Sequence, residues 1–190
     1  MPIIVYLGRN VKEYKEKSGD IIEEMLEKAA LLCEKCLQPM KRHSSYERGI
    51  KETGEKLRIL MVWCKACEEW HALLPDFLLP GKHYSGNEIE SVIIEAETEA
   101  VSGIETEASE ATARRWIGQI GERVKRAIGI LKYLFGRNGK AMSEAAITLG
   151  ARYNELEQIL ELAPKTIKYS GNKLGLANLW LGTSGLKAYI

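Results

Sequence analysis

Four short segments in the first 75 residues of the chain are expected to be strands, two from β-branched composition and two from their position around turns. They cover residues 3–7, 38–46, 56–63 and 69–74. The run Leu57–Trp63 has the strongest strand composition, and the glycine-containing turns before it make it the second arm of a hairpin. We therefore expect a small antiparallel sheet, to which the run at residues 3–7 adds a further strand.

Hydrophobic side chains spaced three and four residues apart predict helices on either side of this sheet. Asp20, with Glu23 three residues later, forms a capping box that would open a helix leading to the first cysteine pair. Ser85 would cap a second helix after the sheet. Residues 75–84 contain two prolines, and we expect them to form an extended connector between the sheet and that helix.

The strongest helical pattern lies in the third quarter of the chain. Ser109 or Thr112 would begin this helix. Its apolar stripe is Trp116, Ile117, Ile120, Val124, Ala127, Leu131 and Leu134. Ser143 would cap the next helix, which Pro164 stops, and a last short helix is expected within residues 172–180.

Length and composition allow one ordinary core or two to three small modules. The chain has 190 residues, of which 45% are hydrophobic, and its longest apolar run is far shorter than the eighteen residues that would indicate a membrane span. The net charge is +1, but residues 81–110 contain one lysine and eight glutamates, whereas residues 111–140 contain eight lysines or arginines and one glutamate. The middle of the chain therefore consists of an acidic segment followed by a basic segment.

All four cysteines occur in two matched pairs, Cys33 with Cys36 and Cys64 with Cys67, separated by 27 residues. A C-x2-C turn presents two thiolates together, and two such turns supply the four soft ligands of a closed tetrahedral zinc site. The long intervening loop is no objection, because each doubling of loop length costs only about 0.6 kcal/mol. We expect one structural Zn²⁺ per chain, because a sheet with so little core of its own would need metal binding, worth roughly 10 to 16 kcal/mol in comparable peptides, to fold.

Two alternatives to zinc remain open: disulfide bonds, and a redox-active dithiol. Disulfides require an oxidising compartment, but Met1–Gly8 shows no basic leader, long apolar region or cleavage site, so we expect a cytoplasmic protein. A redox dithiol would use one pair in a βαβ context. His43 and His71 lie close to the cysteines in sequence, but four thiolates already fill the shell, so we expect neither histidine to be a ligand.

A resemblance supports the zinc interpretation. Cys64-Lys-Ala-Cys67, the run Trp70–Leu78 and then Tyr84-Ser85 before a helix resemble a family of small bacterial proteins with an N-terminal zinc ribbon, catalogued as a domain of unknown function. That family is similar to the zinc-ribbon front ends of insertion-sequence transposases. The likeness covers roughly residues 1 to 120 and departs from the expected aromatic and basic pair at Gly81-Lys82.

The strong helix also has a basic face, which suggests double-stranded DNA as a partner. A helix, a turn and a helix that opens Ala-Thr-Ala-Arg-Arg-Trp resemble the helix-turn-helix of transposases and resolvases. Hydroxyls and amides at a helix N-terminus bind phosphate, and arginines in the first turns reach bases or backbone. The expected DNA-binding residues are Ser109, Thr112, Arg114, Arg115, Gln119, Arg123 and Arg126. The alternative is an amphipathic core helix with a solvated basic face.

No phosphate loop, dinucleotide-binding, zinc-protease or nucleophile-elbow motif occurs, so the sequence offers no catalytic site. Glu105, Glu107 and Glu110 lie too close together to form the carboxylate triad of a transposase, and we interpret them as a solvated acidic loop. We expect a protein that is not an enzyme.

The prediction is an α+β fold: an N-terminal four-cysteine zinc ribbon with a small antiparallel sheet, followed by a mostly α-helical helix-turn-helix region. We place a zinc-ribbon domain with its connector at residues 1–82, the helix-turn-helix region at 83–140 and a C-terminal helical docking segment at 141–190. This segment is a candidate for self-association or for binding a protein partner.

The function we expect is sequence-reading, non-catalytic DNA binding, associated with a mobile element or with transcription control. A zinc-dependent protein–protein interaction adaptor and a transposase-derived fragment without a catalytic domain are the alternatives. Arg114 and Arg115 would read bases in the major groove, whereas Arg123 and Arg126 would contact the backbone.

Overall fold

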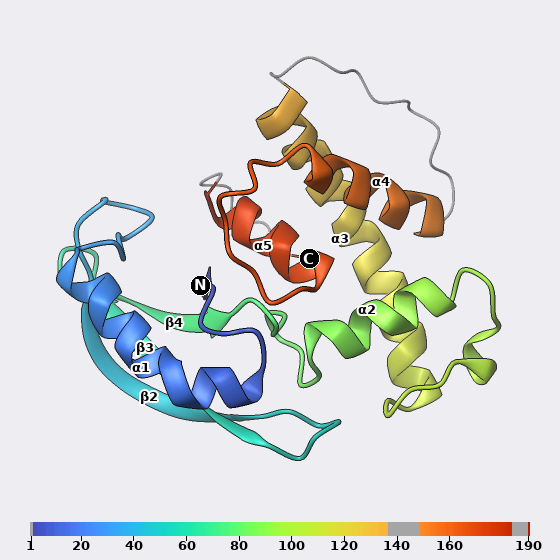
Figure 1. Cartoon of the computed structure of the whole chain (residues 1–190), viewed down its shortest axis with the longest axis horizontal. Helices are drawn as coiled ribbons and strands as arrows, with labels where there is room; N and C mark the ends of the chain where they lie inside the picture. Colours follow the sequence, from blue (N-terminus) through green and yellow to red (C-terminus); the bar gives the residue numbers. More distant parts are fainter. Residues whose placement is uncertain (1, 137–148, 184–189) are drawn as a thin grey trace.

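The computed structural model describes residues 2–136, 149–183 and 190. A sheet and one helix form the N-terminal half, and helices form the rest (Figure 1). The elements are β1 (Ile3–Val5), α1 (Val11–Glu27), β2 (Lys41–Gly49), β3 (Lys56–Cys64), β4 (Glu69–Pro75), α2 (Gly86–Glu95), the 3-10 helix η1 (Val101–Gly103), α3 (Glu110–Gly136), α4 (Leu149–Glu161) and α5 (Lys173–Thr183). This confirms the predicted α+β class.

The sheet has the strand order β1-β4-β3-β2. The predicted hairpin is β2 and β3, and β4 returns antiparallel to β3. At the other edge the added strand β1 runs parallel to β4, with Ile3 opposite Leu73, so the predicted antiparallel part is β2, β3 and β4 and the whole sheet is mixed. Parallel neighbours need a long crossover connection, and α1 together with the hairpin supplies it.

Helix α1 begins ten residues earlier than the sequence predicts. Asn10 is its N-cap: the Asn10 side chain accepts the N–H of Glu13 at 3.0 Å, and the Glu13 carboxylate accepts the N–H of Arg9 at 3.0 Å. This arrangement resembles a capping box, except that Glu13 reaches the N–H of the residue before the N-cap, and Asp20 is an exposed residue inside the helix. The early turns are anchored by Tyr14, whose buried hydroxyl donates to the carbonyl of Arg58 at 2.8 Å.

Two hydrophobic cores divide the described residues. One lies between α1, the sheet and the start of the connector, and includes Phe77 and Leu78. The other is shared by α2, α3, α4 and α5, with Trp116 among its largest buried side chains. Leu79 belongs to this second core, and Leu179 of α5 belongs to the first, so the connector and α5 join the halves.

The connection between α2 and α3 is longer than in a helix-turn-helix. Ser85 and Ser109 cap the two helices, the Ser85 hydroxyl accepting the N–H of Glu88 and the Ser109 carbonyl accepting the N–H of Ala113. Residues 96–109 lie between the helices, compared with the three or four residues of the compact motif. Hydrogen bonds from Thr106 and Glu107 to the Glu88 carboxylate, at 2.6 and 3.0 Å, hold this segment against α2.

The C-terminal helices α4 and α5 pack against the rest of the same chain. The predicted inward residues Tyr153, Leu156, Ile159 and Leu160 of α4 are buried, while the predicted cap Ser143 lies outside the described residues. Helix α5 buries its leucines in the two cores of this chain. No helix within the described residues is long and apolar enough to cross a membrane.

Candidate functional site: a four-cysteine cluster and a basic helix

Each cysteine pair occupies a tight turn. In the first turn the N–H of Cys33 donates to the carbonyl of Gln38 at 2.9 Å, and the N–H of Leu37 donates to the carbonyl of Cys33 at 2.8 Å. The second turn joins the end of β3 to β4. The residue after the second cysteine is left-handed in both turns, with φ of +57° at Leu37 and +53° at Glu68. A non-glycine residue adopts this conformation only when its surroundings impose it, so the two turns have the same constrained shape.

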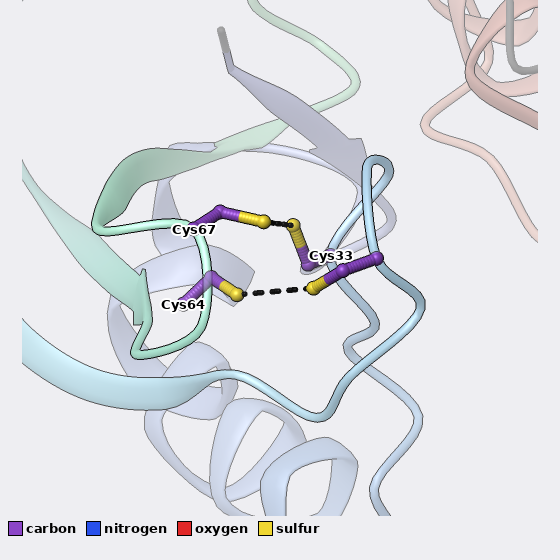
Figure 2. A group of neighbouring side chains, drawn as sticks. Cys33, Cys64 and Cys67 are labelled. Carbon is purple, nitrogen blue, oxygen red and sulfur yellow. Dashed lines mark hydrogen bonds between the residues drawn. The ribbon is translucent and has the colours of Figure 1, made fainter.

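The two turns face each other and bring the four sulfurs together (Figure 2). Cys33 Sγ lies 3.8 Å from Cys67 Sγ, and Cys36 Sγ lies 3.4 Å from Cys64 Sγ. All four sulfurs lie within 4.8 Å of one another. A tetrahedral ion with bonds of about 2.3 Å separates its sulfur ligands by about 3.8 Å, and the sulfur–sulfur distances here are close to that value. The cluster can therefore hold a metal ion.

The same distances argue against the disulfide alternative. A disulfide has an S–S bond of about 2.05 Å. The four cysteines are free, and the close pairs join one turn to the other instead of lying within a C-x2-C. The ligand set thus links β3 and β4 to the segment that follows α1.

The electrostatics of the cluster favour a bound cation. Burial raises the pKa of the Cys33 thiol, but backbone N–H donors of Cys36 and Lys35 outweigh burial and bring this pKa to about 7. Hydrogen bonding with Cys36, and then burial, raise the pKa of Cys67 to about 12. The sulfurs therefore cannot all ionise at neutral pH unless a positive ion compensates their charge. An ion pair between Lys35 and Glu69 ties the two turns together at the surface.

Among the described residues, the cluster consists of the four cysteines and includes neither histidine. His43 packs edge-on against Trp70, with ring centroids 3.9 Å apart, and Trp63 stacks on Trp70 at 6.0 Å. His71 is buried. An aromatic group on β2, β3 and β4 therefore lies beside the cysteine turns, with the Trp70 side chain half exposed.

Three of the predicted DNA-binding residues make local contacts at the start of α3, and the other four share one exposed side of the helix. The Ser109 hydroxyl lies 2.9 Å from the hydroxyl of Thr112 and caps the helix. Arg114 pairs with Glu110, its Nε donating to a carboxylate oxygen at 3.1 Å. Arg114 is thus partly neutralised by its own helix.

The remaining four residues share one side of α3. At 100° per residue, Arg115, Gln119, Arg123 and Arg126 fall within an arc of about 80°. All four are exposed, whereas Trp116, on the core side of the helix, is buried. Glu122 is the acidic residue beside this arc. We call Arg115, Gln119, Arg123 and Arg126 the basic stripe.

Two further basic residues, which no sequence pattern indicated, lie close to the basic stripe. Lys82 of the connector donates from Nζ to Gln119 Oε1 at 2.7 Å, which places a further cation against the basic stripe. Lys51, from the turn between β2 and β3, lies near it, with Nζ 5.8 Å from the centre of the Tyr84 ring. In the sequence, the only unusual feature near these lysines is the departure from the family pattern at Gly81-Lys82. That departure does not indicate which residues lie close together in the fold.

Residues 33–116 match a family described as a domain of unknown function (DUF6431). The match begins at the first cysteine of the cluster and ends at Trp116, so it spans the cysteine turns, the hairpin, the connector, α2 and the start of α3. Neither curated proteins nor solved structures include a match to this chain.

Proposed function

We propose that the chain is a non-catalytic, zinc-stabilised protein that binds double-stranded DNA through the basic stripe of α3. The observation that carries this proposal is that α3 has six basic and two acidic side chains, and that three arginines gather on one exposed side. Phosphate contacts by arginine and lysine dominate the affinity of proteins for duplex DNA. A straight helix with exposed arginines on one side fits along a groove or across a backbone.

Zinc is the metal we propose for the cysteine cluster. Four thiolates in a closed arrangement suit Zn²⁺, and with all four positions occupied by protein the ion has no open site for a substrate. Its role is then to fix the two turns, the hairpin and the start of the connector. Because Lys82 lies in that connector, the metal would also help to position a cation against α3.

The extended connection between α2 and α3 changes the expected mode of binding. A compact helix-turn-helix supports its recognition helix with the preceding helix and a short turn. Here α3 is supported by the connector, α2 and the C-terminal helices, so the support is the whole helical core. Recognition of a particular DNA sequence, and a role in a mobile element or in transcription control, remain expectations that rest on the resemblance to transposases.

A salt titration tests the proposal. The zinc-loaded chain of residues 1–190 is titrated into a fluorescently labelled random-sequence duplex at several KCl concentrations, and binding is followed by anisotropy. Three arginine–phosphate contacts predict a slope of log K against log[KCl] of about −3. Absence of binding at low salt would contradict the proposal.

The adaptor alternative is favoured by one observation, the exposed aromatic group of His43, Trp63 and Trp70. Tryptophan is enriched at the centres of protein interfaces. If this surface is the functional one, the chain binds no duplex in the titration, and replacing Trp70 abolishes partner binding. Retention of duplex binding by Trp70→Ala would leave α3 as the functional element.

A further inference from the structure

A polar hollow lies where three segments distant in sequence meet. The turn after β2 supplies Lys51, the connector supplies Gly81–Tyr84, and the first turns of α3 supply Thr112, Arg115, Trp116 and Gln119. Its volume is about 340 Å³. The hollow adjoins the basic stripe, because Arg115 and Gln119 belong to both.

Hydrogen bonds from the hairpin fix the shape of this hollow. The guanidinium of Arg48 donates to the carbonyl of Leu79 at 2.8 Å and also to the carbonyl of Lys82. The N–H of Lys51 donates to the carbonyl of His83 at 2.8 Å, and Glu52 accepts the N–H of Ser85 at 2.6 Å. The connector is therefore held at three points, with a fourth at Ser85 directly after it, so the backbone that carries Lys82 is fixed before any ligand arrives.

Three cations from different segments line the hollow, namely Lys51, Lys82 and Arg115, and none of its described lining residues is acidic. Burial, and then the charges of Arg123 and Arg115, lower the pKa of Lys82. Holding like charges close together in a partly desolvated place costs free energy unless an anion joins them.

The contact that Lys82 makes in this hollow differs from the ion pairs that other lysines form. Lys35 and Lys132 each meet a carboxylate, whereas the ammonium of Lys82 meets the neutral amide of Gln119. An amide oxygen orients the ammonium but does not neutralise it. The positive charge of the hollow thus remains available to a ligand.

We propose that this hollow binds one backbone phosphate of the DNA duplex, gripped by Lys82, Arg115 and Lys51. The inference deepens the proposed function and rests on it. A guanidinium fork and two ammonium groups approaching from separate segments suit the several oxygens of a phosphate. Arg123, the next cation along α3, continues the path toward the neighbouring phosphates of the same strand.

This assignment changes the role expected for Arg115. An arginine that reads a base would discriminate between sequences when removed, whereas one that holds a phosphate contributes equally to all duplexes. Arg115 is therefore a positioning contact to the backbone. The adjacent Arg114, which pairs with Glu110 outside the hollow, provides a matched control in the same helical turn.

The test compares Arg115→Met and Lys82→Met with Arg114→Met. Anisotropy with two unrelated duplexes should show that each hollow variant loses affinity equally for both and lowers the salt slope by about one, while Arg114→Met changes the slope by less than half as much. Arg115→Lys should restore most of the slope. Metal content and thermal unfolding of every variant verify that it is folded.

A second arm uses inorganic phosphate as the probe. At matched ionic strength, sodium phosphate should raise the thermal unfolding temperature of the unsubstituted protein above its value in sodium chloride, and this rise should disappear in Lys82→Met/Arg115→Met. Normal duplex binding with unchanged salt slopes in the hollow variants overturns the inference and leaves the proposed function standing. If phosphate raises the unfolding temperature of the unsubstituted protein alone, and that protein binds no duplex, the hollow holds a phosphate that does not come from DNA. This result overturns both the proposed function and the assignment of the phosphate to DNA.

Discussion

Replacing Asp76 by asparagine should change how the stability of the protein depends on pH. Asp76 follows β4 directly and is fully buried. One oxygen of its carboxylate accepts the N–H of Ser170 at 2.6 Å, and the other has no hydrogen-bond partner in the part of the chain that the structure describes. The side chain thus joins the end of the sheet to the segment before α5, at the junction of the two halves.

The size of the effect follows from the pKa. Burial raises the pKa of Asp76 from 3.8 to about 6, against the opposing hydrogen bond from Ser170. Because the pKa in the folded state is above that in the unfolded state, the ionised carboxylate destabilises the fold above about pH 6, and the penalty is lost as pH falls toward 4. A shift of about two units corresponds to about 3 kcal/mol, of which about half is relieved between pH 8 and pH 5.

Urea unfolding of the zinc-loaded protein at pH 8, 7, 6 and 5 measures this effect. The free-energy difference between Asp76→Asn and the unsubstituted protein should change by about 1.4 kcal/mol over that range, in the direction of greater relative stability of the variant at high pH. At any single pH, the difference in unfolding free energy also includes the cost of burying the asparagine amide. The change of that difference with pH is therefore the informative quantity. The exposed Asp20→Asn is the control. Parallel pH curves for Asp76→Asn and the unsubstituted protein would refute the reasoning.

Three further substitutions test the fold and the cluster. Cys36→Ser should reduce bound metal below one ion per chain and unfold the sheet half, and a variant that keeps one tightly held ion and an unchanged melting curve would contradict the site. Gly175→Ala should destabilise the protein by about 3 kcal/mol in urea unfolding, because the added Cβ would lie 2.2 Å from the Asp76 carbonyl oxygen. The control is Gly118→Ala, whose Cβ would meet no atom within 4 Å and which should be neutral or stabilising. Trp116→Ala should cost about 3 to 5 kcal/mol in the same assay, since it empties a site packed against Tyr84; a loss below about 1 kcal/mol would be inconsistent with that packing.

Features with local causes could be predicted from the sequence. Ser85 and Ser109 cap helices because a side-chain or backbone oxygen followed by helical residues satisfies amides nearby in sequence. The cysteine pairs were recognisable because the C-x2-C spacing itself creates the turn that presents two sulfurs. The run Leu57–Trp63 forms most of β3 because its composition suits a strand with one buried face.

Features that depend on distant residues could not be predicted. The polar first half of α1 contains Gly19 and many lysines and glutamates, so its helical character depends on Asn10 and on Tyr14 reaching the carbonyl of Arg58. The parallel direction of β1 depends on the path of everything between Val5 and β4. The basic hollow needs Lys51 and Lys82 to meet α3, and only the folded hairpin and connector bring them there.

The most direct measurement of the central proposal is the duplex affinity of Arg123→Glu/Arg126→Glu. Lys12→Glu/Lys17→Glu, at two exposed positions of α1, reverses the same number of charges away from α3 and serves as the control. In anisotropy titrations across KCl concentrations, reversal on α3 should weaken binding to all duplexes and lower the salt slope by about two, while the control retains a nearly unchanged slope. Equal losses for both pairs would mean that net charge alone attracts DNA, and undiminished binding by the α3 variant would contradict the proposal.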